Sequence, residues 1–236
     1  MPRRIDNNFN AEPTIKDISQ IYDVLTDEEK EKVLNNHSVK HFKKNDVIYQ
    51  EGEIPDSLLC LGSGKVKVYK VGFGGRDQIV RMANPTSFIG YRAFFAEGPH
   101  VASAVVIEPC TIFYIPKAIV YELLESNHQF SLNIIRSLAQ ELGFSRYRTV
   151  TLTQKHIRGR LAESLLVLKD IYGFEDDGIT LNVYLSREDL ANFSNMTTSN
   201  AIRTLSTFVN EKVITVDGRI IRILDQETLE KISKLG

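Results

Sequence analysis

Residues 185–213 of the chain read LSREDLANFSNMTTSNAIRTLSTFVNEKV. Ser186, with Asp189 three positions later, is typical of a helix N-cap followed by an acidic first turn. Residues 194–196 favour a tight turn, and Thr197 can cap a second helix. The stretch therefore predicts two short helices joined by a turn. We expect the inner face of the second helix to carry its apolar residues: Ala201, Ile202, Leu205, Phe208 and Val209.

Short hydrogen-bonding side chains and one long cation share the outer face of the second helix: Thr198, Ser199, Arg203 and Ser206. A helix fits the DNA major groove, where an Arg can bind guanine with two hydrogen bonds or clamp a phosphate. For this pair of helices alone, an ordinary helical hairpin with a solvated polar face is the alternative. Two β-branched runs follow, residues 213–216 and 219–223, and the Asp217-Gly218 turn between them predicts a β-hairpin. The complete pattern favours a winged helix-turn-helix.

Length and composition indicate a folded chain of one or two domains. With 236 residues, of which 42% are hydrophobic, the chain can bury a substantial core. We find no signal-peptide pattern and no apolar run near the roughly 20 residues of a membrane span, so we expect no membrane partner. Cys60 and Cys110 stand alone in apolar segments. This favours buried thiols in a reduced cytoplasm and leaves too few cysteines for an iron–sulfur cluster with four cysteine ligands.

The charge of the chain gives no overall nucleic-acid signature. The formal net charge is −1, so any DNA-binding surface has to be a local patch. The basic residues that could form this patch lie in the helix pair and in the wing: Arg187, Arg203, Lys212, Arg219 and Arg222.

The first half of the chain changes from helical to strand-like texture. Residues 1–13 are polar, and we interpret them as a mobile arm; residues 14–35 carry a helical pattern with a start signal at Thr26. Residues 65–71 alternate between polar and apolar, as a half-buried strand does. Turn signals at residues 43–46, 62–64, 72–75 and 108–109 separate short strands, which predict a small β-barrel or jelly roll. The predicted strands are residues 47–49, 58–61, 65–71, 78–80, 101–107 and 111–115.

A long helical segment follows the strands. After a helix over residues 117–125, a periodic pattern begins near Asn127 and fades at residues 151–154, which we interpret as a hinge. Positions at alternating spacings of three and four form the seam of a two-stranded coiled coil: Ile135, Leu138, Leu142, Ser145, Thr149 and Leu152. Packing of this helix on its own barrel is the alternative, and we favour a dimer helix. The predicted domains are residues 1–126, 127–153 and 154–236.

The order of barrel, long helix, hinge and winged helix-turn-helix resembles the Crp/Fnr superfamily of bacterial transcription regulators. Residues 50–53 and 62–66 are similar to the glycine turns of that family, residues 88–95 to its effector cassette, and residues 159–162 to the start of its DNA-binding domain. The resemblance implies an α+β fold with an N-terminal jelly-roll barrel of the cyclic-nucleotide-binding type. It also implies a homodimeric, sequence-specific DNA-binding regulator that is controlled by a small-molecule or redox effector.

The effector cassette departs from the cyclic-nucleotide pattern. Tyr91 follows the cassette glycine where those members carry Glu, and Val101-Ala102 replace an Arg-Ser pair. A buried phosphate without a cation or hydroxyl donor would cost several kcal/mol, so we do not expect cyclic AMP to be the effector. Ser145 keeps a hydroxyl where the family contacts the base. The resemblance places the effector pocket at Gly90, Tyr91, Arg92, Val101, Ala102, Ser103, Ser145 and Arg146.

The resemblance to the Crp/Fnr superfamily leaves haem as an alternative ligand. The oxygen-sensing branch of the family uses an N-terminal cysteine cluster, and this chain has no cysteine before Cys60. The haem-binding branches stay open, although the histidines are irregularly spaced and Met82 and Met196 give no stronger case. The residues considered as haem ligands are Pro2, His37, His41, His100, His128 and His156. We expect no other metal site.

The recognition helix also departs from the common family pattern. Members that read a TGTGA-type half-site carry Arg-Glu at the positions of Thr198-Ser199 and an Arg at the position of Arg203. Here Arg203 alone remains, so we expect a two-fold symmetric operator with an altered half-site. Arg187 lies where the family contacts a backbone phosphate. The predicted DNA-binding residues are Ser186, Arg187, Thr197, Thr198, Ser199, Asn200, Arg203 and Ser206.

Three classes of function are compatible with the sequence or close enough to require a test. A DNA-binding regulator is favoured, with double-stranded DNA, a second copy of the chain and RNA polymerase as expected partners, and haem-based gas or redox sensing as a variant. A scaffold or interaction protein that kept the fold is the second class. An enzyme is not expected, because we find no nucleophile–base motif, and the glycines at residues 72–75 lack the Lys-Ser/Thr of a phosphate-binding loop.

Overall fold

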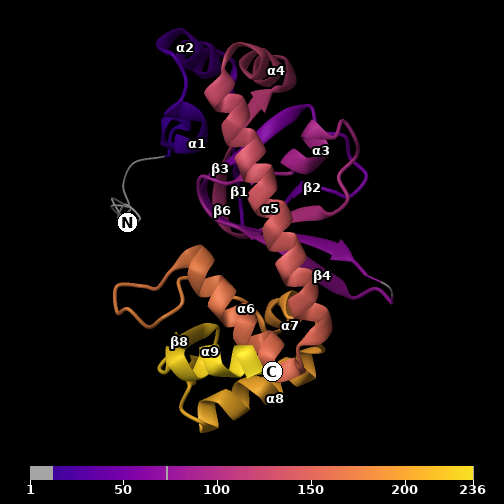
Figure 1. Ribbon diagram of the computed structural model, residues 1–236, viewed down its shortest axis with the longest axis vertical. Helices are drawn as coiled ribbons and strands as arrows, with labels where there is room; N and C mark the ends of the chain where they lie inside the picture. The colour runs from indigo at the N-terminus through magenta and orange to yellow at the C-terminus, as the bar shows by residue number, and fades with distance from the viewer. Residues whose placement is uncertain (1–12, 73, 236) are drawn as a thin grey trace.

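The computed structural model describes residues 13–72 and 74–235. An N-terminal domain built on a sheet lies at one end, the long helix α5 runs from it, and a C-terminal domain lies at the other end (Figure 1). No helix of the described residues is long and apolar enough to cross a membrane. Residues 1–12, which include most of the predicted arm and Pro2, lie outside the described part of the chain.

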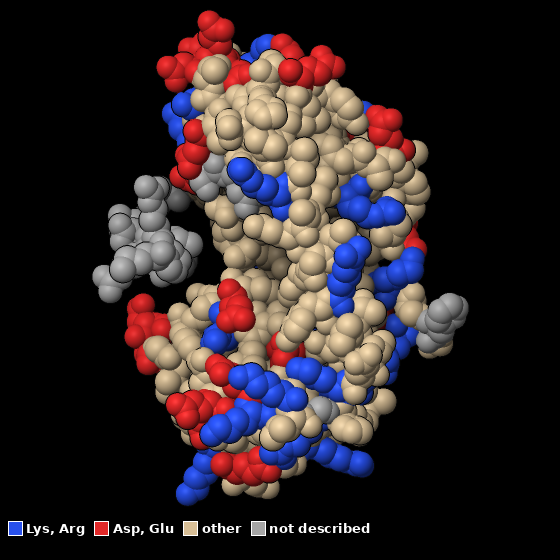
Figure 2. Space-filling model, viewed as in Figure 1, with Lys and Arg blue, Asp and Glu red and all other residues tan. Residues whose placement is uncertain are grey.

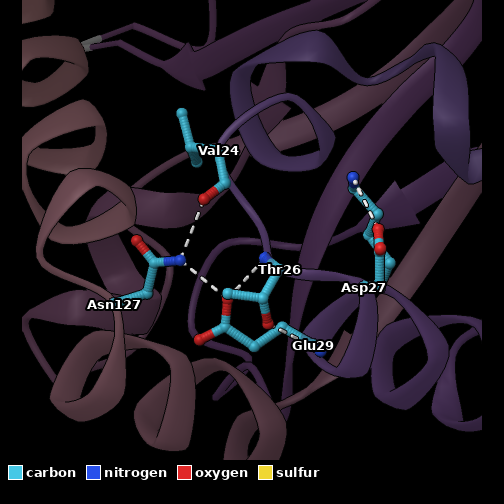
Figure 3. Close-up of polar contacts among 6 residues, drawn as sticks. Val24, Thr26, Asp27, Glu29 and Asn127 are labelled. Carbon is cyan, nitrogen blue, oxygen red and sulfur yellow. Dashed lines mark hydrogen bonds and ion pairs between the residues drawn. The ribbon is translucent and has the colours of Figure 1, made fainter.

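Short helices precede the sheet: η1 (Ile15–Asp17), α1 (Ser19–Tyr22) and α2 (Asp27–Asn36). Thr26 starts α2 as predicted, because its hydroxyl accepts from Glu29 N at 3.3 Å and Glu29 Oε2 accepts from Thr26 N at 2.9 Å. Asn127 Nδ2 donates to Glu29 Oε2 at 2.7 Å and to Val24 O at 2.9 Å (Figure 3). The first helices are thus bound to the start of α5.

The sheet is dominated by two long strands that pair antiparallel along most of their length, β3 (Ser57–Val71) and β6 (Ser103–Pro116). The strand order is β1-β6-β3-β4, with β2 paired to β6 and β5 to β3. The other strands are β1 (Ser38–Phe42), β2 (Val47–Tyr49), β4 (Asp77–Ala83) and β5 (Phe88–Ile89).

Two predicted turns, at residues 62–64 and 108–109, are wrong. The first lies inside β3 and the second inside β6. Both strands are continuous there, and their pairing register shifts between Leu61 and Val66 of β3. The glycines serve close packing: a Cβ on Gly62 would lie 2.4 Å from Phe113 Cε2, and one on Gly64 would lie 2.2 Å from Pro109 O. A bulge and a turn need the same residue type, so the sequence alone did not separate them.

Helix α4 (Lys117–Ser126) leads into α5 (His128–Gln154), whose first turn is capped by Asn127 Oδ1 accepting from Phe130 N at 2.9 Å. Phe130 and Ile134 are buried against the barrel, and Leu138 packs partly against the same cluster. Helix α5 continues through Gln154, so the interruption between α5 and α6 falls at residues 155–156 rather than within 151–154.

The C-terminal domain contains α6 (Ile157–Tyr172), α7 (Arg187–Phe193), α8 (Thr198–Asn210), β7 (Ile214–Asp217), β8 (Ile220–Ile223) and α9 (Gln226–Leu235). The predicted wing is present, because β7 pairs with β8 from Ile214↔Ile223 to Asp217↔Ile220. Helix α9, which the sequence analysis did not predict, packs on α6. Its buried Ser233 and Lys155, which lies between α5 and α6, both donate to Glu163 of α6, which also accepts from Tyr147 of α5.

Candidate DNA-binding surface and effector pocket

Helix α7 begins with the predicted cap. Asp189 N donates to Ser186 Oγ at 2.9 Å, and Ser186 Oγ donates to Asp189 Oδ2 at 2.7 Å. Lys67 of β3 reaches Asp189 Oδ1 at 2.6 Å. Burial raises the pKa of Asp189, but the hydrogen bonds from Lys67 and Ser186 outweigh burial and hold that pKa below its usual range. The carboxylate is therefore a fixed anion that joins α7 to the barrel.

The C-terminal end of α7 receives donors from outside its own domain. Arg148 of α5, which is 5% exposed, donates Nη2 to Phe193 O at 2.5 Å, and its Cζ lies 4.2 Å from the Phe193 ring centroid. Gln78 of β4 donates Nε2 to Asn192 O at 2.7 Å. Cations and donors are favourable at a helix C-terminus. Burial lowers the pKa of Arg148 to about 10, so it stays charged at neutral pH.

Helix α8 presents its outer face to solvent. Thr197 caps the helix by accepting from Asn200 N at 3.3 Å, and Arg203 lies exposed on the outer face without an ion pair among the described residues. Ala201, Leu205 and Phe208 face the core. Of the predicted DNA-binding set, the exposed members on α8 and its cap are Thr197, Thr198, Ser199, Arg203 and Ser206, and Asn200 is half-buried.

Two residues assigned to the inner face of α8 are instead exposed. Ile202 is 46% exposed and Val209 is 37% exposed. On a helix of 3.6 residues per turn, the buried positions 201, 205 and 208 fall within an arc of about 60°, and the two exposed residues lie on one flank of it, about 40–60° beyond Leu205. The apolar face is therefore narrower than the residue types suggested.

The wing lies beside the start of α7. Arg187 donates Nη2 to Gly218 O at 2.7 Å, in the turn between β7 and β8. Arg219, next along that turn, is exposed. Lys and Arg side chains gather over the C-terminal domain, with Asp and Glu among them (Figure 2). The local basic patch expected from the sequence thus has its members on the α7 N-terminus, the wing and α8.

The predicted effector cassette surrounds the start of α3 (Tyr91–Phe95). Gly90 has φ +67°, and a Cβ there would lie 2.5 Å from His100 Cε1. His100 is buried and stacks on Tyr49, with ring centroids 3.7 Å apart. The structure thus fills the space beside Gly90 with two aromatic rings.

The remaining predicted effector residues do not converge. Arg92 and Val101 are exposed, Ala102 is buried, and Ser103 Oγ accepts from Glu51 N at 3.0 Å. Ser145 and Arg146 lie exposed on α5. Tyr91 alone among the eight predicted pocket residues lines the cleft described next.

A cleft of about 200 Å³ lies between the barrel and α5. Arg81 of β4 spans it: its Nε lies 3.2 Å from Glu141 Oε2, its Nη1 donates to Phe88 O at 2.7 Å, and its Cζ lies 5.3 Å from the Tyr91 ring centroid. Burial raises the pKa of Tyr91 to about 12. Sequence reasoning missed most of the lining residues, which are Arg81, Ser87, Phe88, Ser137, Gln140, Glu141 and Phe144. The charged Arg81 between the apolar residues Val80 and Met82 of β4 is the signal that could have found this cleft.

The haem-ligand candidates are dispersed. His37 Nδ1 lies 3.1 Å from Val33 O, His41 Nδ1 lies 3.2 Å from Thr111 Oγ1, and His100 takes part in the aromatic stack. Within residues 13–72 and 74–235, no three His, Cys, Asp or Glu side chains form a metal-binding group. Both cysteines are buried free thiols, and burial raises the pKa of Cys110 to about 12.

Comparisons with known proteins cover both domains of this chain. The cyclic nucleotide-binding domain family matches residues 39–127, and the Crp-like helix-turn-helix domain family matches residues 159–232. A CRP-like cAMP-activated global transcriptional regulator of Mycobacterium tuberculosis is 24% identical over 191 residues, which cover 80% of this chain and 85% of that protein. The anaerobic regulatory protein of Bacillus subtilis is 24% identical over 221 residues, 91% of this chain and 90% of that protein.

Solved structures share the fold. FixK2 from Bradyrhizobium japonicum aligns with a TM-score of 0.75 at 21% identity, covering 83% of this chain and 96% of that one. A CooA mutant from Carboxydothermus hydrogenoformans aligns with a TM-score of 0.72 at 19% identity, covering 94% and 98%. The expected fold is confirmed, and the relatives are transcription regulators rather than enzymes. With a barrel, a long helix and a winged helix-turn-helix in this order, the chain belongs to the Crp/Fnr superfamily of DNA-binding transcription regulators.

Proposed function

We propose that this chain acts as a homodimer that binds a two-fold symmetric operator and responds to a small-molecule effector other than cyclic AMP. The observation that carries the DNA-binding part is the state of α8: its outer face, with Arg203 among short polar side chains, is exposed. At the same time, α7 is held from outside its domain. Because α7 and α8 pack on one another, this support of α7 also positions α8, whose outer face can then enter the major groove.

The dimer proposal rests on α5. Ile135 is 60% exposed and Leu142 is 53% exposed, on a helix whose other face already packs on the barrel. Leu138 is partly buried on the barrel side, so the proposed seam is carried by Ile135 and Leu142 together with the smaller residues Ser145 and Thr149. A second α5 is the occupant that matches this seam, because residues at spacings of three and four pair in a two-stranded coiled coil.

The effector proposal rests on the cleft between β4, α3 and α5. Its Arg81–Glu141 pair offers both a cation and an anion next to the Tyr91 ring, which suits a small ligand with polar and flat apolar parts. The positions that hold the cyclic phosphate in nucleotide-binding members, Val101 and Ala102, supply no side-chain donor. Cyclic AMP at millimolar concentration should therefore leave the melting temperature unchanged.

The proposed division of labour follows the predicted domains. Residues 1–126 sense the effector, residues 127–153 dimerise, and residues 154–236 bind DNA. As a transcription regulator, the dimer would act on RNA polymerase at the promoter.

Selection of binding sites from random duplex DNA tests the function. The purified chain should enrich a two-fold symmetric motif, and binding to it should weaken steeply with salt. An Ile135→Glu, Leu142→Glu double variant should be monomeric by light scattering and should lose operator binding, whereas a Gln129→Glu variant with an exposed charge outside the seam should behave as wild type. Enrichment of no motif would favour the scaffold alternative.

A further inference from the structure

The hairpin between β3 and β4 reaches the helix-turn-helix. Its turn is closed by Gly72 N donating to Arg76 O at 2.9 Å, and Arg76 Nη2 donates to Asn195 Oδ1 at 2.7 Å. Asn195 has φ +51° and stands two residues before Thr197, the N-cap of α8. A guanidinium carried by the barrel domain therefore lies beside the turn that leads into the recognition helix.

A second guanidinium, that of Arg160 on α6, interacts electrostatically with the first. Arg160 of α6 donates Nη1 to Leu152 O at 3.1 Å, while its Nε is buried without a hydrogen-bond partner among the described residues. Burial lowers the pKa of Arg160, and the charge of Arg76 lowers it further.

Neither guanidinium is neutralised by a carboxylate. Among the described residues, the arginine ion pairs within 4.0 Å are Arg81–Glu141 and Arg158–Glu211. Two like charges without a counterion are unfavourable, since the repulsion grows as water is excluded. The β3–β4 hairpin does not require the charge of Arg76 to dock on α7, because the neutral Gln78 of β4 already donates to Asn192 O.

An anion would resolve this arrangement, and DNA brings one to this place. When the N-terminus of a recognition helix enters the major groove, backbone phosphates lie around it. Arg76 is exposed, and one of the five guanidinium N–H donors suffices for Asn195. We propose that Arg76 binds a phosphate of the operator, so that the sensing domain itself forms a second DNA contact beside the helix-turn-helix.

This proposal rests on the proposed DNA-binding function and adds a contact outside the DNA-binding domain. A phosphate contact carries no sequence information. It should therefore strengthen binding to all sequences alike and lengthen the protected DNA backbone without changing the selected motif.

The salt dependence of operator binding measures this contact. Each neutralised phosphate contributes about 0.9 to the slope of log K against log salt, so Arg76→Gln should reduce the slope by about 1.8 in a symmetric dimer. Arg76→Lys keeps the charge and should retain most of the slope. Lys44→Gln removes an exposed charge from the turn between β1 and β2 and should leave the slope unchanged. Equal melting temperatures would establish that the variants are folded.

Three outcomes would overturn the proposal. An unchanged slope in Arg76→Gln, with a reduced slope in Arg187→Gln as the positive control, would show that DNA does not reach Arg76. Equal losses in Arg76→Gln and Arg76→Lys would indicate a purely structural hydrogen bond to Asn195. If 10 mM inorganic phosphate raises the melting temperature of wild type but not of Arg76→Gln, and the slope is unchanged, the ligand is a free anion. Failure of the wild-type chain to bind any duplex would instead refute the proposed function itself.

Discussion

The two helices of the helix-turn-helix differ in what holds them. Helix α7 is contacted by side chains from three elements outside its domain, through Lys67 on β3, Gln78 on β4 and Arg148 on α5. Helix α8 packs its inner face on the core of its own domain and leaves its outer face exposed. One helix is thus positioned by the rest of the protein, and the other is free to meet DNA.

Because α7 is held by the barrel, a movement within the barrel can change the position of the helix pair that meets DNA. Helices α7 and α8 pack directly on one another, so a shift of β4 or α5 that moves α7 also moves α8. The cleft that we propose as the effector site lies between these same two elements, with Arg81 on β4 and Glu141 on α5. A ligand that changes their separation would bias the position of α7.

The largest effect is expected in the anchored helix. Phe193 of α7 is fully buried beneath Arg148, so Phe193→Ala should lower the free energy of unfolding by about 3–5 kcal/mol. Ile202 of α8 is 46% exposed, and Ile202→Ala should cost much less, below about 1 kcal/mol. Urea denaturation followed by circular dichroism measures both. Similar losses in the two variants would contradict the contrast between the helices.

The Lys67–Asp189 pair should make the anchoring pH-dependent. The two side chains are 22% and 19% exposed, and Lys67→Met should cost about 1.5–2 kcal/mol at neutral pH. Because the folded pKa of Asp189 lies below its usual range, this stabilisation is complete above the unfolded pKa of about 3.9 and disappears as the pH falls through the folded pKa.

Unfolding free energies of wild type and Lys67→Met should therefore differ by a constant amount between about pH 7 and pH 5 and converge below about pH 4. Lys44→Gln, which changes an exposed lysine, provides the control and should show no such convergence relative to wild type. A difference that stays constant into acid would mean that the ion pair does not hold α7.

The smallest contrast is between the two caps. Ser186 both accepts from Asp189 N and donates to the carboxylate that binds Lys67, whereas Thr197 makes a single cap bond to Asn200 N. Cap removal costs about 0.5–2 kcal/mol. Ser186→Ala should fall near the upper end and Thr197→Ala near the lower end in thermal unfolding. The opposite order would show that the cap of α7 does not support its anchoring.

Much of the DNA-binding domain could be predicted because its signals are local. The caps at Ser186 and Thr197 bond to residues three positions away, and the Asp217-Gly218 turn lies between two adjacent strands. The coiled-coil seam was likewise predicted from spacings of three and four residues. In the structure one of its members, Leu138, packs partly against the barrel-side cluster.

The anchoring contacts and the cleft could not be predicted in the same way. Lys67 and Asp189 are 122 positions apart, and Gln78 and Asn192 are 114 positions apart, so no spacing rule connects them. Arg148 is on the long helix, where a polar residue normally indicates a solvated position. Its burial follows from the docking of the C-terminal domain, which the sequence alone does not specify.

We propose that Arg203, on the exposed face of α8 beside the anchored α7, reads a base. Binding of wild type, Arg203→Ala and Arg187→Ala to the selected operator, and to the same operator with one base pair changed in both half-sites, tests it most directly. Arg203→Ala should cost about 1–3 kcal/mol per half-site and abolish the preference at that pair, whereas Arg187→Ala should weaken both operators alike. If Arg203→Ala leaves both affinities and the base preference unchanged, α8 is not the helix that reads the operator.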